Sequence, residues 1–443
     1  MLDKIKNIKI PTVYFSLVFL GYILTLPFAG LRMGIFSSLL LVAIIVEIGL
    51  FVIKSDNKSD FISLINICVL AYAIYNFFSF IWIMKNGYPV SIYAEEFSNS
   101  ILPIVFYFVA AIMCKNEDEK NNDCTELIYK AFLYSFAIYS FISIVMYVWA
   151  PQFYCDYLVR IGMISKADAA TCHVRMESFT GSTILSYLGV AAMLVAAKFM
   201  YKCASNKKSV KELIIYSALF VFNLIVVFMA NGRAGMVAAL LVIVYINFLV
   251  FFTFKFVDKK YLYIELGLIA AIVIAICFAT PGIAAKVWAR LVSLPGAIGQ
   301  RSEQWIAAIN NMPGGWHGQW FGNGLGANGH KAIGIDGAHI VADGGLVKLY
   351  CEEGAIGFAL YVFIFMIIFR AGAKNLKKYF AELGIIGTAL LMSVGSNIIA
   401  FQLCLPIVFF AAGVVGKDTK SNGLLDDKQT PTEVSDKEKE IVL

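Results

Sequence analysis

Long apolar runs separated by short polar segments recur from one end of the chain to the other. Each run has about 20 residues, the length that an α-helix needs to cross the hydrocarbon core of a bilayer. This pattern predicts an all-α, polytopic membrane protein with one transmembrane domain over residues 1–416. The polar segment that follows, 417–443, has the composition of a disordered tail. The twelve predicted spans are 11–30, 34–53, 61–83, 99–114, 127–150, 181–201, 212–230, 234–254, 261–280, 346–369, 379–395 and 399–416.

Composition and charge agree with this fold class. Hydrophobic residues make up 60% of the 443 residues, the mean hydropathy is +0.77, and 15% of the residues are charged, against about 25% in soluble proteins. Most lysines fall in alternate connecting segments, which predicts that these segments and both termini lie in the cytoplasm. The net charge of +6 therefore follows from membrane topology, and no nucleic-acid partner is expected. The cytoplasmic segments are too short for a nucleotide-binding domain and contain no G-x-x-x-x-G-K-[ST] motif, so ATP-driven chemistry within this chain is not expected.

Two external segments, 151–180 and 281–345, are longer than a simple connection requires. Long ordered loops tend to be functional. Cys155 and Cys172 share the first segment, and an oxidising compartment outside the membrane would favour a disulfide between them. The first half of the second segment has apolar residues at helical spacing, which predicts short helices that lie on the bilayer surface.

Arginine is distributed unevenly across the predicted membrane. Six of the seven arginines fall in external segments, and only Arg370 falls inside. A guanidinium group can bind phosphate or carboxylate through two parallel hydrogen bonds, so an external face rich in arginine is a candidate anion site. For any single exposed arginine, contact with lipid phosphates explains the position equally well. Arg290 and Arg301 would share one face of a continuous helix, but Pro295 and Gly296 predict a break between them.

Two further features could bind an anion. Arg233 lies in the sequence NGRAG, between two predicted spans that almost no loop separates. An unpaired charge at this depth costs about 2.5–3.5 kcal/mol on insertion scales, which favours a functional role, and a structural ion pair with a loop carboxylate is the alternative. The stretch GNGLGANG, residues 322–329, could bind phosphate through its backbone amides, although tight turns at a crowded surface explain it at least as well.

The end of the second external segment brings acid–base groups to the start of a span. His339 and Asp343 are four residues apart, one helical turn, just before the predicted span 346–369. Either side chain could act as a general base beside a bound phosphate, or could be an ordinary polar residue of the membrane interface. Glu352 and Glu353 fall in the first turns of the span, where ion pairs with external arginines would stabilise the helix.

Three segments, in this order, resemble the superfamily of O-antigen ligases and O-antigen polymerases: NGRAGMVAALL, RSEQWIAAINNMPGGWHGQWFGNGLGANG and DGGLVKLYCEEGAIGFALYVF. They are similar to the family's small-residue–Arg–Gly turn, to its Arg–Trp helix with a Gly-x-Gly-x-Gly stretch, and to the E-x-G-x-x-G motif that ends its large periplasmic loop. In the ligase branch a histidine stands eleven residues before the first glycine of that motif. Asp343 occupies this position here, and His339 lies one turn earlier. The difference favours the polymerase branch and leaves both residues as candidate bases.

The resemblance implies a GT-C-like glycosyltransferase of the bacterial inner membrane, with its active site facing the periplasm. It would transfer a glycan from undecaprenyl pyrophosphate to another lipid-linked repeat unit, without a metal or other cofactor. A chain-length regulator is a further candidate partner. The alternatives are an O-antigen ligase, which would use lipid A core as the acceptor, and a flippase or transporter of lipid-linked glycans.

Residue roles follow from this resemblance and from the chemistry of the leaving group. A pyrophosphate carries concentrated negative charge, which arginines must stabilise where no metal does. Arg233 and Arg301 are assigned to the pyrophosphate, with Arg290 as a third. Asp343 or His339 would take the proton from the acceptor hydroxyl. The other predicted substrate-binding residues are Arg175 for an acidic sugar or the acceptor pyrophosphate, Trp316, Trp320 and Tyr350 for stacking on sugar faces, and Glu353.

Overall fold

The computed structural model describes residues 10–24, 34–54, 63–119, 123–160, 176, 178–205, 210–252, 292, 294–312, 316–328, 344–400 and 403–417. Within these ranges the chain forms helices joined by turns and contains no strand, which confirms the predicted all-helical fold class. The helices are α2 (Ile10–Leu24), α3 (Gly34–Lys54), α4 (Leu64–Phe78), α5 (Phe80–Lys85), α6 (Val90–Phe108), η2 (Val109–Cys114), α7 (Lys115–Glu119), α8 (Cys124–Trp149), α9 (Pro151–Arg160), α10 (Ser182–Ser205), α11 (Val210–Ala230), α12 (Arg233–Phe252), α15 (Leu294–Asn310), α16 (Trp316–Phe321), α17 (Gly345–Lys374), α18 (Leu376–Gly395), η5 (Ile398–Ala400) and α19 (Leu405–Gly416).

Seven of the described helical segments are long and apolar enough to cross a membrane. Three shorter apolar helices, within α2, α3 and α19, accompany them. The predicted span 261–280 lies outside the described residues, and each of the other predicted spans overlaps a described helix. The protein is therefore a polytopic helical membrane protein.

The centre of the bundle contains α6, α10 and α19. Every residue of α19 is buried, and 78% of the most apolar stretch of α10 is buried, against 33% for that of α12. The small residues of α10 and α19 let neighbouring helices approach closely, whereas α12 keeps an exposed face, with Leu240, Leu241, Val244 and Phe248, for lipid. The last predicted span, 399–416, thus differs from the structure: the chain forms η5, turns, and begins α19 only at Leu405, so its final 12-residue helix lies inside the bundle.

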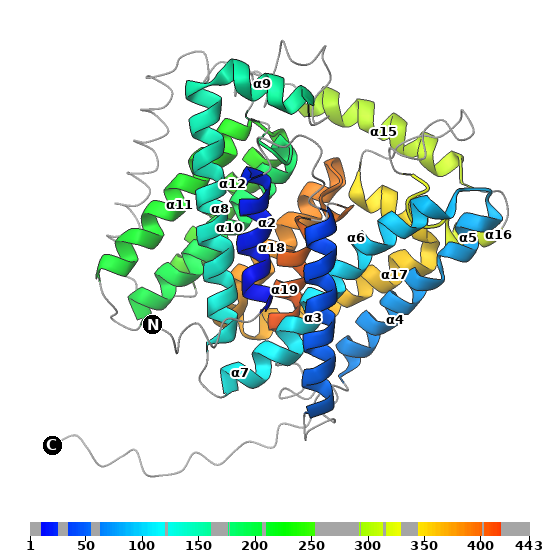
Figure 1. Ribbon diagram of the computed structural model, residues 1–443, viewed down its shortest axis with the longest axis horizontal. Coiled ribbons are helices and arrows are strands. Elements are labelled where there is room, and N and C mark those ends of the chain that lie inside the picture. The colour runs from blue at the N-terminus through cyan, green and yellow to red at the C-terminus, as the bar shows by residue number, and fades with distance from the viewer. Residues whose placement is uncertain are drawn as a thin grey trace.

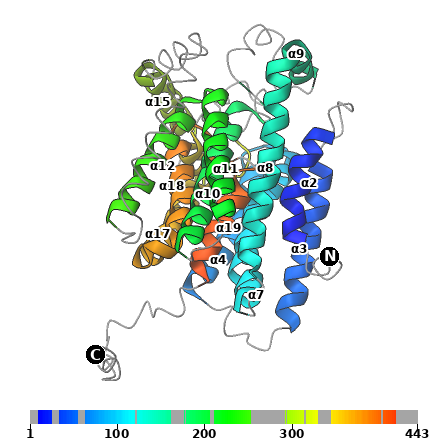
Figure 2. The same ribbon diagram turned by 90° about the vertical axis from the view of Figure 1, so that its left-hand side faces the viewer.

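The two ends of the bundle carry different elements (Figures 1 and 2). α9 and α15 lie across one end, here named the α15 end, and α7 lies at the other, here named the α7 end. Arg160, Arg233 and Arg301 belong to the α15 end, because they lie in α9, at the start of α12 and in α15. Arg370 lies in the half of α17 that approaches the α7 end. The described arginines are therefore sorted as the sequence predicts, and Arg32, Arg175 and Arg290 lie outside the described residues.

Two predictions about the external segments can be compared with the structure. α15 spans Leu294–Asn310 and includes both Pro295 and Gly296. Val292 is helical as well, and the residue between it and α15 lies outside the described residues, so the predicted break between Arg290 and Arg301 stays a prediction. Cys155, in α9, is disulfide-bonded. Its partner lies outside the described residues, and the pairing with Cys172 stays a prediction.

Candidate functional site

Helix α17 is broken at Gly354, in the half of the helix that begins at the α15 end. Gly354 has φ +65° and ψ −170°, a backbone conformation that is essentially restricted to glycine. A Cβ atom on Gly354 would lie 2.5 Å from the backbone nitrogens of Phe321 and Gly322. The glycine of the E-x-G motif is therefore required both by the backbone conformation and by the close approach of α16.

The break frees three consecutive backbone carbonyls of α17, and each receives a donor from outside the helix. The amides of residues 323 and 324 donate to the carbonyls of Cys351 and Glu352 at 2.8 and 2.9 Å. The hydroxyl of Tyr75, in α4, donates to the carbonyl of Glu353. Because buried backbone carbonyls are rarely left unpaired, these contacts from the glycine-rich loop and from α4 stabilise the kink.

Further amides in the described part of the glycine-rich loop also bind the protein. The amide of Leu325 donates to Oγ of Ser79 at 2.9 Å, and the amide of Asn328 donates to Oε1 of Glu352 at 3.0 Å. All residues from 322 to 328 are buried. The tight-turn explanation of this stretch is therefore favoured, because amides that bind protein acceptors are not available to a phosphate.

A network of charged side chains lies one to two turns into α17, with Lys348 and Glu352 buried and Glu96 half-buried. Nζ of Lys348 lies 2.5 Å from Oε1 of Glu96, in α6, and 3.7 Å from Oε1 of Glu352. The side-chain amide of Asn99 donates to Oε2 of Glu96 at 3.2 Å. Removing one partner from a buried ion pair leaves an uncompensated charge, which is costly, so Lys348 holds α6 against α17 at this level. The described partner of Glu352 is thus a lysine, whereas the sequence suggested an external arginine.

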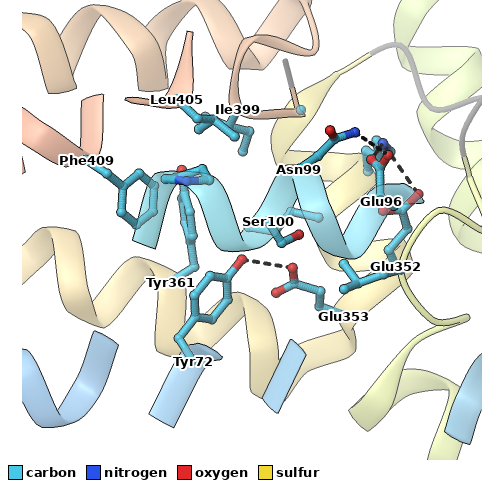
Figure 3. A pocket seen from close by; sticks show the side chains of 15 residues that line it. Tyr72, Glu96, Asn99, Ser100, Glu352, Glu353, Tyr361, Ile399, Leu405 and Phe409 are labelled. Carbon is cyan, nitrogen blue, oxygen red and sulfur yellow. Dashed lines mark hydrogen bonds and ion pairs between the residues drawn. The ribbon is translucent and has the colours of Figure 1, made fainter. Parts of the chain in front are cut away.

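Glu353 lies beside this network at a cavity of about 40 Å³, shown in Figure 3. The hydroxyl of Tyr72 donates to Oε1 of Glu353 at 2.8 Å, and the glutamate side chain is buried. Oε2 of Glu353 has no hydrogen-bond partner among the described residues. Ser100 and Tyr361 also line the cavity. A buried carboxylate oxygen without a partner can accept a hydrogen bond from water or from a ligand hydroxyl.

α15 docks against the start of α17 and the end of α18. A Cβ atom on Gly344 would lie 2.7 Å from Nε1 of Trp305, and one on Gly395 would lie 2.9 Å from Nη1 of Arg301. The missing side chains at these two glycines allow α15 to approach closely. The guanidinium group of Arg301 therefore lies at the α15 end of α18.

Arg233 is the first residue of α12 and lies at a position along the bundle similar to that of Arg301. The hydroxyl of Tyr245, in α12, donates to the carbonyl of Phe380, in α18, at 3.1 Å. Arg233 is twelve residues from Tyr245, and Met392 is twelve residues from Phe380 in the antiparallel helix. Equal rises of about 1.5 Å per residue bring Arg233 to about the level of Met392, which is within one turn of the contact between α15 and α18. Two arginines from separate helices therefore lie at the α15 end of α18.

The chain next to Arg175 is fixed in the same region. Met176 donates its backbone amide to the carbonyl of Met229 at 3.0 Å. Met229 is at the end of α11, one turn before Arg233. Met176, the residue that follows Arg175 in the sequence, is therefore anchored beside the start of α12.

The chain next to Asp343 is fixed there too. Gly344 donates its amide to Oδ1 of Asn397 at 3.0 Å, and Gly345 donates its amide to the carbonyl of Ser396. The start of α17 is thus held against the turn that follows α18. Four of the predicted site residues lie outside the described residues: Arg175, Arg290, His339 and Asp343.

The predicted sugar-stacking residues lie on α16 and α17. Trp316 and Trp320 are exposed, at 67% and 52%. Phe321, in the same short helix, stacks on Trp82 with the ring centroids 4.5 Å apart. Tyr350 is half-buried in the first turns of α17. The described contacts hold α16 against α17 and α5, and they do not bring its tryptophans beside the two arginines.

Sequence reasoning did not single out Lys348, Glu96, Tyr72 or Tyr75. Lys348 stands four residues before Glu352 in an apolar run, the spacing of an ion pair on one helical face. An ionisable residue within a membrane span is itself a candidate functional residue, and Glu96, near the start of α6, gave a similar signal. The two tyrosines stand among other aromatic residues and give no separate signal.

No known protein family matches this chain, and no curated protein matches it. The assignment of a function therefore depends on the residues and the geometry described above.

Proposed function

We propose that this chain is a bacterial membrane glycosyltransferase that polymerises polysaccharide repeat units, such as those of O-antigen, on a lipid carrier. The donor is a glycan on undecaprenyl pyrophosphate, and the acceptor is another lipid-linked repeat unit. The observation that carries the proposal is the position of Arg233 and Arg301, which come from separate helices and lie at the same end of α18. Two guanidinium groups near the end of a transmembrane bundle suit the pyrophosphate of a lipid-linked substrate.

The reaction explains why this site needs arginine. The acceptor hydroxyl oxygen attacks the anomeric carbon of the donor while the bond from that carbon to the pyrophosphate oxygen breaks. The leaving pyrophosphate gains negative charge, which Arg233 and Arg301 stabilise, with Arg290 as a third cation. Removing one donor that is fixed in position before the reaction typically costs on the order of 3 kcal/mol, or about a hundredfold in rate.

The proton of the acceptor hydroxyl passes to a base in the segment that precedes α17. Asp343 and His339 are the two candidates. Gly344, which follows Asp343, is held by Asn397 and lies against Trp305 of α15. Support of this kind suits a catalytic segment, because a base acts only within hydrogen-bond reach of the proton that it removes.

The carboxylates at the cavity favour binding of the sugar there and binding of the phosphate at the arginines. The cavity beside Glu353 is lined by carboxylates and by none of the described arginines, so it suits the uncharged hydroxyls of a sugar better than a pyrophosphate. Oε2 of Glu353 remains available to a hydroxyl group. The exposed rings of Trp316 and Trp320 offer a face for further sugars, Tyr350 adds a third ring, and Arg175 supplies charge for an acidic sugar.

The proposal includes a membrane topology. The chain crosses the bacterial inner membrane twelve times in a GT-C-like arrangement, with both termini in the cytoplasm. The α15 end faces the periplasm. The lysines at the turn between α17 and α18 and beyond α19 support this orientation, because they lie at the α7 end and basic residues favour the cytoplasmic side.

A second candidate function is transport of a lipid-linked glycan. The network of Lys348, Glu96 and Glu352 favours it, because transporters place charged residues within their spans. A ligase would perform the same chemistry with lipid A core as the acceptor. The position of Asp343 in place of the ligase histidine favours the polymerase.

Deletion of the gene in its host separates these functions. Loss of a polymerase leaves lipopolysaccharide that carries a single repeat unit, and the wild-type chain, but not Arg301→Ala, restores the ladder of longer products. Loss of a ligase leaves free lipid-linked polymer, and loss of a flippase leaves no exported repeat unit. Polymer of unchanged length in the deletion strain would overturn the proposal.

A further inference from the structure

A second cavity lies at the α7 end of the bundle, opposite Arg233 and Arg301. Its volume is about 410 Å³, and residues of α7, α8, α10 and α18 line it together with Lys417. A cavity of this size is in the range of small-ligand sites. Its lining includes three carboxylates and five lysines, which are Lys198, Lys202, Lys377, Lys378 and Lys417.

Three of these lysines are held in place by carboxylates. The pairs are Lys198 with Glu382, Lys202 with Glu126, and Lys417 with Asp118. An ammonium group has three donors, so each of these lysines keeps at least one donor for a further acceptor. The ion pairs therefore fix positive charge around the cavity before any ligand arrives.

Lys377 adds a positive charge to the cavity, and Lys378 lies beside it in the sequence. Lys377 is exposed and forms no ion pair with a described residue. Nζ of Lys378 lies 5.1 Å from the ring centroid of Tyr379. Even when the buried Glu382 is included, the lysines at this cavity outnumber the carboxylates, so the site favours an anion.

The rest of the lining is aromatic. Phe199, Tyr201 and Phe380 line the cavity, and the rings of Tyr201 and Phe380 meet edge to face, with their centroids 5.8 Å apart. The cavity lies at the ends of α8 and α10, which are candidate membrane spans. A pocket at this depth, with lysines and aromatic walls, matches the boundary between lipid phosphates and acyl chains.

We propose that this cavity binds the phosphate headgroup of an anionic phospholipid. Membrane topology alone explains an excess of lysine at one end of a bundle. It does not require lysines from α10, α18 and the end of α19 to surround one cavity, or carboxylates that hold three of them. The proposal is independent of the transferase activity, because the two sites lie at opposite ends of the protein.

Lys377 and Lys374 provide a matched pair of substitutions. Both are exposed and lie three residues apart at the turn between α17 and α18, but only Lys377 lines the cavity. The purified full chain is mixed with phosphatidylglycerol, with zwitterionic phosphatidylcholine, or with inorganic phosphate. Bound lipid is then counted by mass spectrometry of the intact complex.

We expect the wild type to retain phosphatidylglycerol in preference to phosphatidylcholine. Lys377→Gln should weaken retention about fivefold, the fold-change that corresponds to about 1 kcal/mol per lysine near anionic lipid. The double variant Lys377→Gln/Lys378→Gln should weaken it further, and Lys374→Gln should leave it unchanged. Unaltered thermal unfolding of both single variants without lipid shows that the fold is intact.

Two results would overturn the proposal. Equal retention of phosphatidylglycerol by Lys377→Gln and Lys374→Gln would show that the cavity does not bind the headgroup. Displacement of phosphatidylglycerol by an equal concentration of inorganic phosphate would assign the site to a free anion instead of a lipid.

Discussion

The backbone amide of Gly324 donates a hydrogen bond of 2.9 Å to the backbone carbonyl of Glu352. This bond joins the glycine-rich loop to the E-x-G segment of α17, two features that the sequence presents separately. It forms because α17 breaks at Gly354 and leaves that carbonyl without a helical donor. The loop thus stabilises a kink, and the kink supports the charged residues that lie one to two turns from the start of α17.

Gly354→Ala should destabilise the protein by about 3–5 kcal/mol, because the new Cβ atom would clash with the backbone at Phe321 and Gly322 in a conformation that disfavours alanine. Gly387→Ala is the matched control in α18, since a Cβ atom there meets only a ring atom of Phe369 at 3.8 Å. Replacing a helical glycine without a clash should stabilise by up to about 1 kcal/mol. Thermal unfolding in detergent measures both, and equal unfolding temperatures would refute the structural role of Gly354.

Lys348→Met should cost about 3–5 kcal/mol, because it leaves the buried Glu352 and the half-buried Glu96 without their cation. Adding Glu352→Gln to this variant should recover part of the loss. Lys374→Met, at the exposed end of the same helix, should leave the unfolding temperature unchanged. If the double variant is no more stable than Lys348→Met alone, the two residues are not coupled as the structure indicates.

Arg233→Ala and Arg301→Ala should each lower polymer synthesis about a hundredfold, because each removes a positioned donor to the leaving pyrophosphate. Arg160→Ala is the control, since Arg160 is exposed at the end of α9 at the same end of the bundle. Glycan chain length in complemented deletion cells, with protein levels matched, reports the effect. Normal chain lengths with Arg301→Ala would remove Arg301 from the site.

Replacing the base should slow the reaction without preventing substrate binding. Asp343→Asn and His339→Ala are compared with the double variant, and one of the single variants should lose about a hundredfold or more in rate, in line with the usual contribution of a general base. Donor binding should stay close to that of the wild type. Full activity of the double variant would exclude both residues as the base.

Much of the fold follows from hydrophobic pattern. Runs of about 20 apolar residues predict helices that the structure contains, and the lysine distribution predicts which end of the bundle holds most of the described arginines. The interior position of α19 is not predictable in this way, because its apolar residues would suit lipid and protein surroundings equally well. Pro406, at the start of α19, is the local reason that the last helix begins late.

Less of the candidate site can be predicted from the sequence. Arg233 and Arg301 stand out because charge is rare near spans, but the contact between Lys348 and Glu96 joins residues 252 positions apart. The kink at Gly354 depends on a positive φ value, which six of the described glycines adopt, and the neighbouring residues do not show which of these glycines breaks a long helix. Local pattern carries no information about either, since both arise from the packing of α17 against α6, α16 and the glycine-rich loop.

The most direct test of the proposed function uses purified protein and lipid-linked repeat units in detergent, where no sealed bilayer exists. We expect longer lipid-linked glycans and one released undecaprenyl pyrophosphate for each bond formed, with the rate about a hundredfold lower for Arg301→Ala and unchanged for Arg160→Ala. Absence of elongation by the wild type in detergent, together with movement of repeat units across sealed proteoliposomes, would contradict the polymerase and establish transport.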